Sequence, residues 1–242
     1  MRKLIASLAV AGVLGVAGFA AAEDAVERME STFADPNYSR LLFAPTARPL
    51  RQGEGYLADH EVLFPGVAYG LTENISLAGG LSVIPGLGLS EQVFYLSPKV
   101  GFDLNDHASV AVGALVATGG GGEFDDRESA RIGFAVGTFG SPRHSFTVGA
   151  GIGDTSSGFS DAVPILMAGG TTTMSRHVAL VGETWMFLGQ DFQLSEQPFG
   201  AGVRLFNDRL SADLGVILIG ELIDEGFPIP WVSVSYHFGA KR

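Results

Sequence analysis

The chain has 242 residues, contains no cysteine, and carries a formal net charge of −11 from 15 Lys and Arg against 26 Asp and Glu. The lack of cysteine excludes disulfides, thiolate metal sites and thiol catalysis. The acidic balance disfavours binding to nucleic acid or another polyanion through a basic patch, so we expect no nucleic-acid partner.

The N-terminus has the three regions of a secretory signal. Two basic residues precede an apolar run over residues 4–19, and the run ends in three alanines at 20–22. This order predicts a signal peptide over residues 1–22 that is cleaved after Ala22. A retained membrane helix is the alternative, but the apolar run is short for a span. Residues 23–37 are charged and irregular, so we assign them to a periplasmic leader, either a short helix, a flexible segment or a plug.

Beyond residue 37 the chain alternates apolar residues with polar or small ones. Near the C-terminus, for example, Val232, Val234 and Tyr236 alternate with Ser233 and Ser235. A period of two predicts a strand with one apolar and one polar face. About twelve such strands of roughly ten residues are expected. They cover residues 38–46, 56–71, 75–83, 96–104, 109–116, 131–137, 146–152, 163–173, 178–187, 199–205, 210–218 and 232–238.

The connections between the expected strands alternate in length. Short turns are expected at 72–74, 105–106, 141–143, 175–176 and 207–208, where Asn, Asp, Ser and Pro favour turns. Longer polar or Gly-rich loops are expected at 47–55, 85–91, 118–128, 153–160, 188–197 and 220–228. Transmembrane barrels have short periplasmic turns and longer outer loops. The sequence therefore predicts one domain over residues 38–242, an all-β, antiparallel up-and-down transmembrane barrel with both termini in the periplasm.

A soluble β-sandwich or a soluble lipid-binding barrel would show the same period of two. The face opposite the apolar one consists here of Gly, Ser, Ala and Thr with scattered charges, which a barrel lumen can hold. This composition favours the membrane barrel, with the apolar face of every strand turned to lipid.

Six charged residues fall on the face expected to line the lumen. Buried charges persist when they are paired, so the favoured interpretation is an ion-pair network that ties strands across the barrel. The alternative is that the charges line a solute path and set its charge preference. The six candidates are Lys99, Asp103, Arg131, Glu183, Arg204 and Asp213.

No catalytic, metal or cofactor site is expected. His144 and Ser145 have the residue types of a serine hydrolase, but neighbours on a strand face opposite sides. His60 lies between two acidic residues that diverge from it for the same reason. The acidic loop with Glu123, Asp125, Asp126 and Glu128 is interpreted as a solvated tip rather than a calcium site. Aromatic residues near strand ends are assigned to membrane-interface girdles: Tyr69, Phe94, Tyr95, Trp185, Phe187, Trp231, Tyr236 and Phe238.

The runs LLFAPTARPLRQGEGY (41–56) and FPGVAYGLTENISLAGGLSVIPG (64–86) resemble a group of uncharacterised bacterial outer-membrane β-barrel proteins. The chain departs from the usual ending of such barrels, in which an aromatic residue is the last one, because four residues follow Phe238. The resemblance implies no defined substrate and supplies no catalytic residues. For a barrel in the outer membrane we expect its lipid and, during biogenesis, the barrel-assembly machinery as partners, with a small solute as a further partner if the lumen is open. We therefore expect a narrow pore or a structural envelope protein in the cell outer membrane. A soluble periplasmic barrel that binds an apolar ligand, or a lipid-modifying barrel enzyme, is the alternative.

Overall fold

The computed structural model describes residues 35–119, 128–155, 162–189, 192–219 and 228–239. The expected signal peptide at 1–22 and most of the expected leader lie outside these ranges, as does most of the acidic loop.

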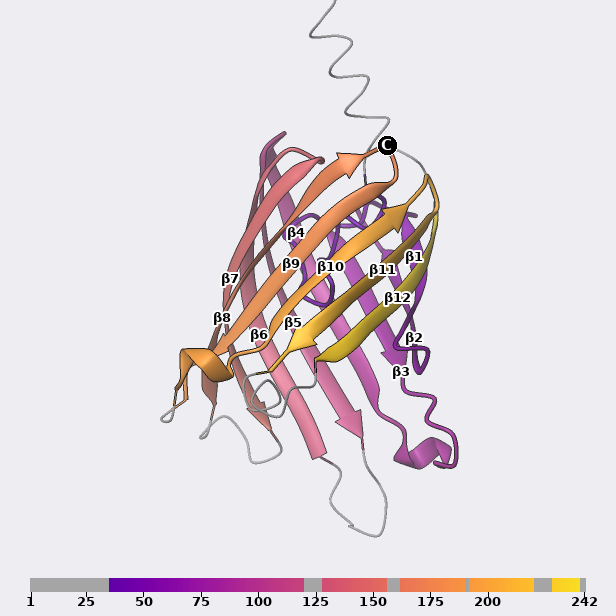
Figure 1. Cartoon of the computed structure of the whole chain (residues 1–242), viewed down its shortest axis with the longest axis vertical. Helices are drawn as coiled ribbons and strands as arrows, with labels where there is room; N and C mark the ends of the chain where they lie inside the picture. Colours follow the sequence, from indigo (N-terminus) through magenta and orange to yellow (C-terminus); the bar gives the residue numbers. More distant parts are fainter. Residues whose placement is uncertain (1–34, 120–127, 156–161, 190–191, 220–227, 240–242) are drawn as a thin grey trace, which may run out of the picture.

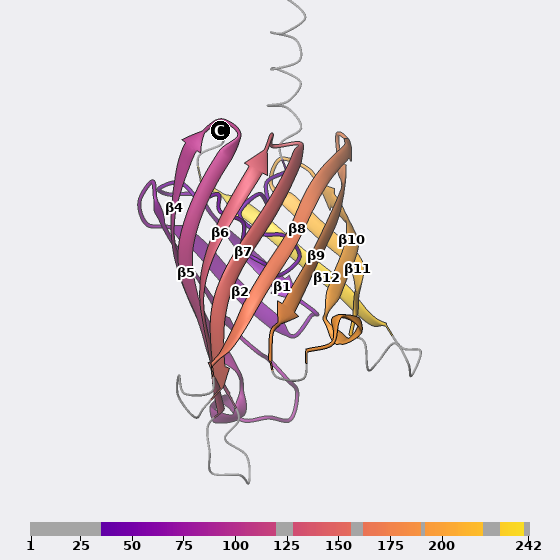
Figure 2. The ribbon, with the colours of Figure 1, turned by 90° about the vertical axis from the view of Figure 1, so that its left-hand side faces the viewer.

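Twelve antiparallel strands form a closed barrel (Figures 1 and 2). Each strand pairs with its neighbours in the chain, and β1 closes the barrel against β12, with Gly55 opposite Phe238. The strands are β1 (Gly55–His60), β2 (Phe64–Gly70), β3 (Ile75–Leu81), β4 (Phe94–Asn105), β5 (Ala108–Gly119), β6 (Glu128–Gly140), β7 (His144–Thr155), β8 (Val163–Ser175), β9 (Val178–Phe187), β10 (Phe199–Phe206), β11 (Leu210–Leu218) and β12 (Ile229–Phe238). In the described parts of the long loops there are two short 3-10 turns, η1 (Leu89–Glu91) and η3 (Leu194–Glu196). The predicted twelve-stranded antiparallel barrel is confirmed.

The barrel has a turn end and a loop end. All five predicted short turns lie at the turn end, where β12 also finishes, which is the upper end in Figure 1. The long connections emerge from the opposite end. The expected loop at 47–55 is an exception, because it leads from the lumen into β1 at the turn end.

The predicted number of strands is correct only because two errors in the prediction cancel. Residues 38–46 form no strand and contain a single bridge between Arg40 and Pro45. Residues 56–71 form two strands, because the chain reverses at 61–63. Glu61 and Val62 make this turn with positive φ angles of 55° and 64°. Neither is a residue type that usually marks such a turn, so the alternating pattern predicted one continuous strand across it.

An apolar belt surrounds the outside of the barrel. Val112, in the middle of β5, is 56% exposed, and apolar residues at alternate positions of most other strands are similarly open. No helix in the described residues is long and apolar enough to cross a membrane. Members of the belt include Leu57, Val67, Leu96, Phe102, Phe146, Leu180, Leu205, Leu214 and Val234.

Residues 35–54 lie inside the barrel and fill the turn-side half of its lumen; we call them the inner segment (Figure 1, indigo). Leu41 and Leu42 are 1% and 0% exposed and pack with Ala44 and Ala47 against inward residues of the wall. Burying this apolar surface stabilises the segment in place. The sequence analysis considered a plug only for residues 23–37. The inner segment consists mostly of residues that were predicted to form a first strand (38–46) and a loop (47–55).

Candidate functional site

Arg204 anchors the inner segment to the wall of the barrel. It lies on β10 opposite Asp213 of β11, and its side chain is fully buried. Its Nε donates to Asp213 Oδ1 at 2.6 Å, and its Nη1 donates to Asp35 Oδ2 at 2.7 Å. Its Nη2 also donates to the carbonyl oxygen of Leu41 at 2.7 Å. One guanidinium therefore joins two strands to both ends of a seven-residue stretch of the segment.

Arg40 extends this cluster from the segment side. Its Nη2 donates to the hydroxyls of Ser233 (3.1 Å) and Ser235 (2.9 Å) on β12. Its Nη1 lies 3.5 Å from Asp213 Oδ2 and donates to the carbonyl oxygen of Leu42. The guanidinium also lies over the ring of Tyr56, 5.8 Å from its centroid. Both Nη atoms of Arg40 are thus bound by wall and segment, while its Nε is buried without a hydrogen-bond partner among the described residues.

Lys99 and Glu183 hold the backbone of the inner segment. The Nζ of Lys99 on β4 donates to the carbonyl oxygens of Ser39, Thr46 and Arg48 at 2.9–3.1 Å. Across the lumen, Glu183 on β9 accepts from the backbone N–H groups of Phe43 and Ala44 at 3.1 and 3.0 Å. An irregular backbone buried away from water needs such partners, because unpaired amides and carbonyls are costly. The sequence pattern placed both residues in the lumen, but it did not show that their partner is the chain's own backbone.

Further contacts fix the segment at the turn end. Arg51 forms an ion pair with Asp103, which also accepts from the hydroxyl of Ser109 at 2.7 Å. The N–H of Ala47 donates to Thr138 Oγ1 of β6 at 2.8 Å. Asp103 therefore faces inward, but at the rim rather than along a passage.

Arg131 is the one of the six charged candidates that the structure places outside the lumen. On β6 the inward positions are Phe134, Val136 and Thr138, and Arg131 lies on the exposed opposite face. The expectation that every apolar face meets lipid is wrong for this strand. An apolar inner segment makes the lumen itself a core, so β6 turns Phe134 and Val136 toward that core.

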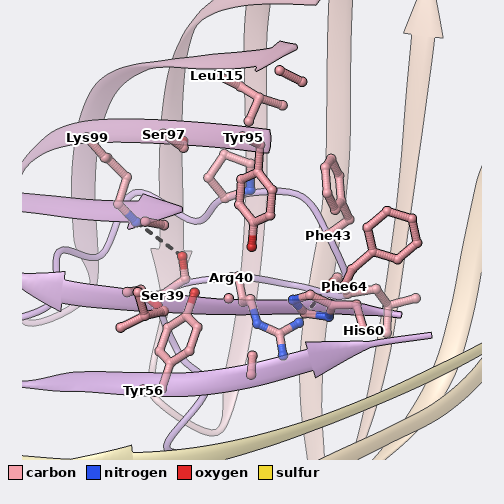
Figure 3. A pocket seen from close by; sticks show the side chains of 18 of the residues that line it. Ser39, Arg40, Phe43, Tyr56, His60, Phe64, Tyr95, Ser97, Lys99 and Leu115 are labelled. Atoms are coloured by element: carbon pink, nitrogen blue, oxygen red, sulfur yellow. Dashed lines mark hydrogen bonds between the residues drawn. The ribbon is translucent and has the colours of Figure 1, made fainter. Parts of the chain in front are cut away.

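A chamber of about 380 Å³ occupies the loop-side half of the lumen. The inner segment forms its floor with Arg40, Leu42 and Phe43, and its walls are mainly aromatic and aliphatic (Figure 3). This volume is in the range of small-molecule pockets, roughly 300–1,000 Å³. The inward wall residues include Tyr56, Ala58, His60, Phe64, Ala78, Tyr95, Leu115, Ala117, Ile132, Phe134, Trp185 and Trp231.

Three of the aromatic residues predicted for the membrane-interface girdles belong to this chamber. Tyr95, Trp185 and Trp231 line the lumen, whereas Tyr69, Phe94, Phe187 and Tyr236 point outward and are 41–44% exposed. A signal was present in the sequence, because Tyr95 and Trp231 share the alternate positions of Lys99 and Ser233. Parity with those polar residues indicates the lumen.

Tyr95 reaches into the chamber over two glycines. A Cβ at Gly66 would overlap its hydroxyl, and one at Gly80 would lie 2.8 Å from it. In Figure 3 the phenol hangs from β4 with its oxygen directed toward Arg40. Within the described residues no hydrogen-bond partner is recorded for this hydroxyl. Gly66 and Gly80 therefore make room for an inward phenol that ends in a free polar group.

The other candidates do not assemble into a site. His144 lies on the exposed face of β7 and Ser145 on the face turned inward, next to the turn at 141–143. The described residues contain no group of three or more His, Cys, Asp or Glu side chains that could hold a metal ion. His60 instead packs its ring against Trp231, with centroids 5.7 Å apart.

Comparison with solved structures identifies barrels of the porin type. The KdgM porin aligns with a TM-score of 0.55 at 8% identity, over 77% of this chain and 98% of that chain. The KdgM porin in complex with disordered oligogalacturonate gives a TM-score of 0.54 at 7% identity, over 78% of this chain and 98% of that one. At such identities the likeness establishes the fold alone. No protein-family model matches the chain, and no curated protein matches it.

Proposed function

We propose that this chain is a non-catalytic β-barrel protein of the bacterial outer membrane whose lumen is closed at rest by residues 35–54. The observation that carries the proposal is the belt of exposed apolar side chains around the barrel. In water such a belt would be an aggregation hazard, whereas lipid tails solvate it. The likeness in fold to the KdgM porin supports the same assignment.

The two roles considered from the sequence were a narrow pore and a structural envelope protein. The contacts of the inner segment favour a barrel that is closed at rest, since Lys99, Glu183 and Arg204 bind the segment instead of facing a passage. Passage of a small solute would require the segment to move. In the orientation with short turns in the periplasm and long loops outside, the chamber faces the exterior of the cell.

Cell fractionation with a heat-modifiability gel tests the location, and planar-bilayer recording tests the resting state. We expect folded protein in the detergent-extracted outer membrane that migrates faster before boiling, with no steady conductance. Outer-membrane lipid and the barrel-assembly machinery are the partners this location implies. Recovery of the folded protein in the soluble periplasmic extract would overturn the membrane assignment and favour a soluble barrel instead.

An esterase assay tests the non-catalytic assignment. Lipid-ester hydrolysis by the purified barrel that disappears in Ser145→Ala or His144→Ala would contradict it. We expect no hydrolysis above that of empty micelles, because the two side chains lie on opposite faces of β7.

A further inference from the structure

We propose that the chamber in the loop-side half of the lumen binds a small, uncharged, apolar molecule whose one hydrogen-bond acceptor meets the hydroxyl of Tyr95. The inference goes beyond the proposed function and does not depend on it. It requires only the folded barrel, wherever that barrel is located.

The shape and lining of the chamber define the body of the ligand. Its walls carry Phe64, Leu115, Phe134 and Trp185 in the half of the lumen that the inner segment leaves open. Elsewhere in the lumen the inner segment covers such residues, as it does for Val136. Apolar walls with few polar groups favour an apolar occupant, since transfer from water releases the hydration of both surfaces.

The cations that line the chamber argue against an anionic ligand. Lys99 already donates to three backbone carbonyls, and Arg40 is held by Asp213 and two serine hydroxyls. Arg40 Nε alone has no partner among the described residues, and it is buried, so a carboxylate could pair with either cation only by displacing these partners at a large desolvation cost. The chamber therefore suits a neutral molecule.

Tyr95 supplies the polar contact that extends into the chamber, whereas His60 Nδ1 and Trp231 Nε1, which have no hydrogen-bond partner in the described ranges, are buried in its wall. Its hydroxyl points into the chamber in Figure 3, and within the described part of the chain it has no recorded hydrogen-bond partner. Gly66 and Gly80 are the positions that allow it to lie there, because a Cβ at either would press on the phenol. A phenol that donates to a ligand oxygen would orient the molecule and distinguish it from a pure hydrocarbon.

Ligand-observed fluorine NMR on the purified barrel in detergent tests the proposal with three probes of similar size. They are para-fluoroacetophenone, which is neutral with one acceptor, para-fluorotoluene, which has none, and para-fluorobenzoate, which is an anion. We expect acetophenone to bind more tightly than toluene, and benzoate to bind least. Tighter binding of benzoate than of acetophenone would overturn the assignment of an uncharged ligand.

Two pairs of variants locate the binding. Ala117→Trp fills the chamber and is expected to abolish binding of both neutral probes, while Ala135→Trp on the outer face of β6 leaves it unchanged. Tyr95→Phe removes the hydroxyl and is expected to weaken acetophenone about 3- to 10-fold, the effect of one hydrogen bond, with no change for toluene. Tyr69→Phe, on the outer face, is the control.

The faster migration of unboiled protein verifies that each variant is folded. Binding that survives in Ala117→Trp, or that equals partition into empty micelles, would show that the chamber is not the site. An unchanged preference for acetophenone in Tyr95→Phe would show that Tyr95 is not the contact. Failure of the membrane assignment would appear in the fractionation experiment and would leave these binding results as they are.

Discussion

Arg204 and Asp213 face each other on neighbouring strands and form a two-pronged ion pair that water does not reach. The Nε–Oδ1 and Nη2–Oδ2 distances are 2.6 and 3.0 Å, and the two side chains are 0% and 1% exposed. Two charges are tolerated there because each is matched and hydrogen-bonded. Asp35 of the inner segment binds the same guanidinium, so the pair also holds this segment in place.

Replacement of Arg204 should therefore destabilise the whole barrel. Arg204→Ala leaves Asp35 and Asp213 buried without their main partner, and we expect the free energy of unfolding to fall by about 3–5 kcal/mol. Urea unfolding in detergent, followed by tryptophan fluorescence, measures the change. Arg131→Ala, on the outer face, is the matched control and should change the value by no more than about 0.5 kcal/mol. Equal midpoints for the two variants would contradict a central role for the pair.

The barrel itself could be predicted from the sequence because alternation and loop lengths are local properties. The five short turns were predicted from Asn, Asp, Ser or Pro and were placed to within one residue. The reversal at Glu61 and Val62 was missed, since neither residue is typical of a turn with positive φ. The first predicted strand was wrong because residues 38–46 contain apolar residues that pack inside the barrel rather than outside it.

The site was only partly predictable, because its partner groups are distant in the chain. Alternation placed Lys99, Glu183, Arg204 and Asp213 inside the barrel. It could not show that they bind residues 35–54, which lie at least 45 residues away and have no repeating pattern. Arg131 was placed in the lumen for the same reason. Without knowledge of the inner segment the lumen was taken as empty, and an empty lumen would favour small or polar inward residues on β6.

Glu183 should control how firmly the inner segment closes the lumen. Glu183→Ala removes the acceptor for the N–H groups of Phe43 and Ala44, so the segment loses two hydrogen bonds at its innermost point. We expect transient openings in planar-bilayer recordings where the unmodified protein is silent. Glu183→Gln keeps one acceptor oxygen and should open less often.

Asp106→Ala is the control for this change of charge. Asp106 is exposed in the turn between β4 and β5, so its removal should leave the recordings silent. Steady conductance of the unmodified barrel would instead show that residues 35–54 do not close it. Silence of Glu183→Ala would show that its two hydrogen bonds are dispensable for closure.

An added methyl group at Gly70 should weaken the packing of the inner segment against the wall. A Cβ at this position would overlap the carbonyl oxygen of Arg51 and come within 2.7 Å of that of Leu50. Because both contacts are backbone atoms, relief requires the inner segment to shift. We expect Gly70→Ala to lower the free energy of unfolding by about 1–3 kcal/mol in the same urea assay. Gly133→Ala has nothing within 4 Å of its new Cβ and should leave stability unchanged; similar losses in both would point to a general effect of the strand backbone.

Val112 tests whether the apolar belt meets lipid. It lies near the middle of β5 and is 56% exposed, so Val112→Arg would place a charge against acyl chains. For a lipid-facing site near the bilayer midplane we expect a loss of about 2–4 kcal/mol in the free energy of folding into liposomes. The fraction of heat-modifiable protein across a urea series measures it. Val62→Arg, in the turn at the loop end and 75% exposed, adds the same charge outside the belt and should fold as the unmodified protein does. Equal folding of the two variants would mean that the face of β5 is solvated by water, and the apolar belt would then need a protein partner to cover it.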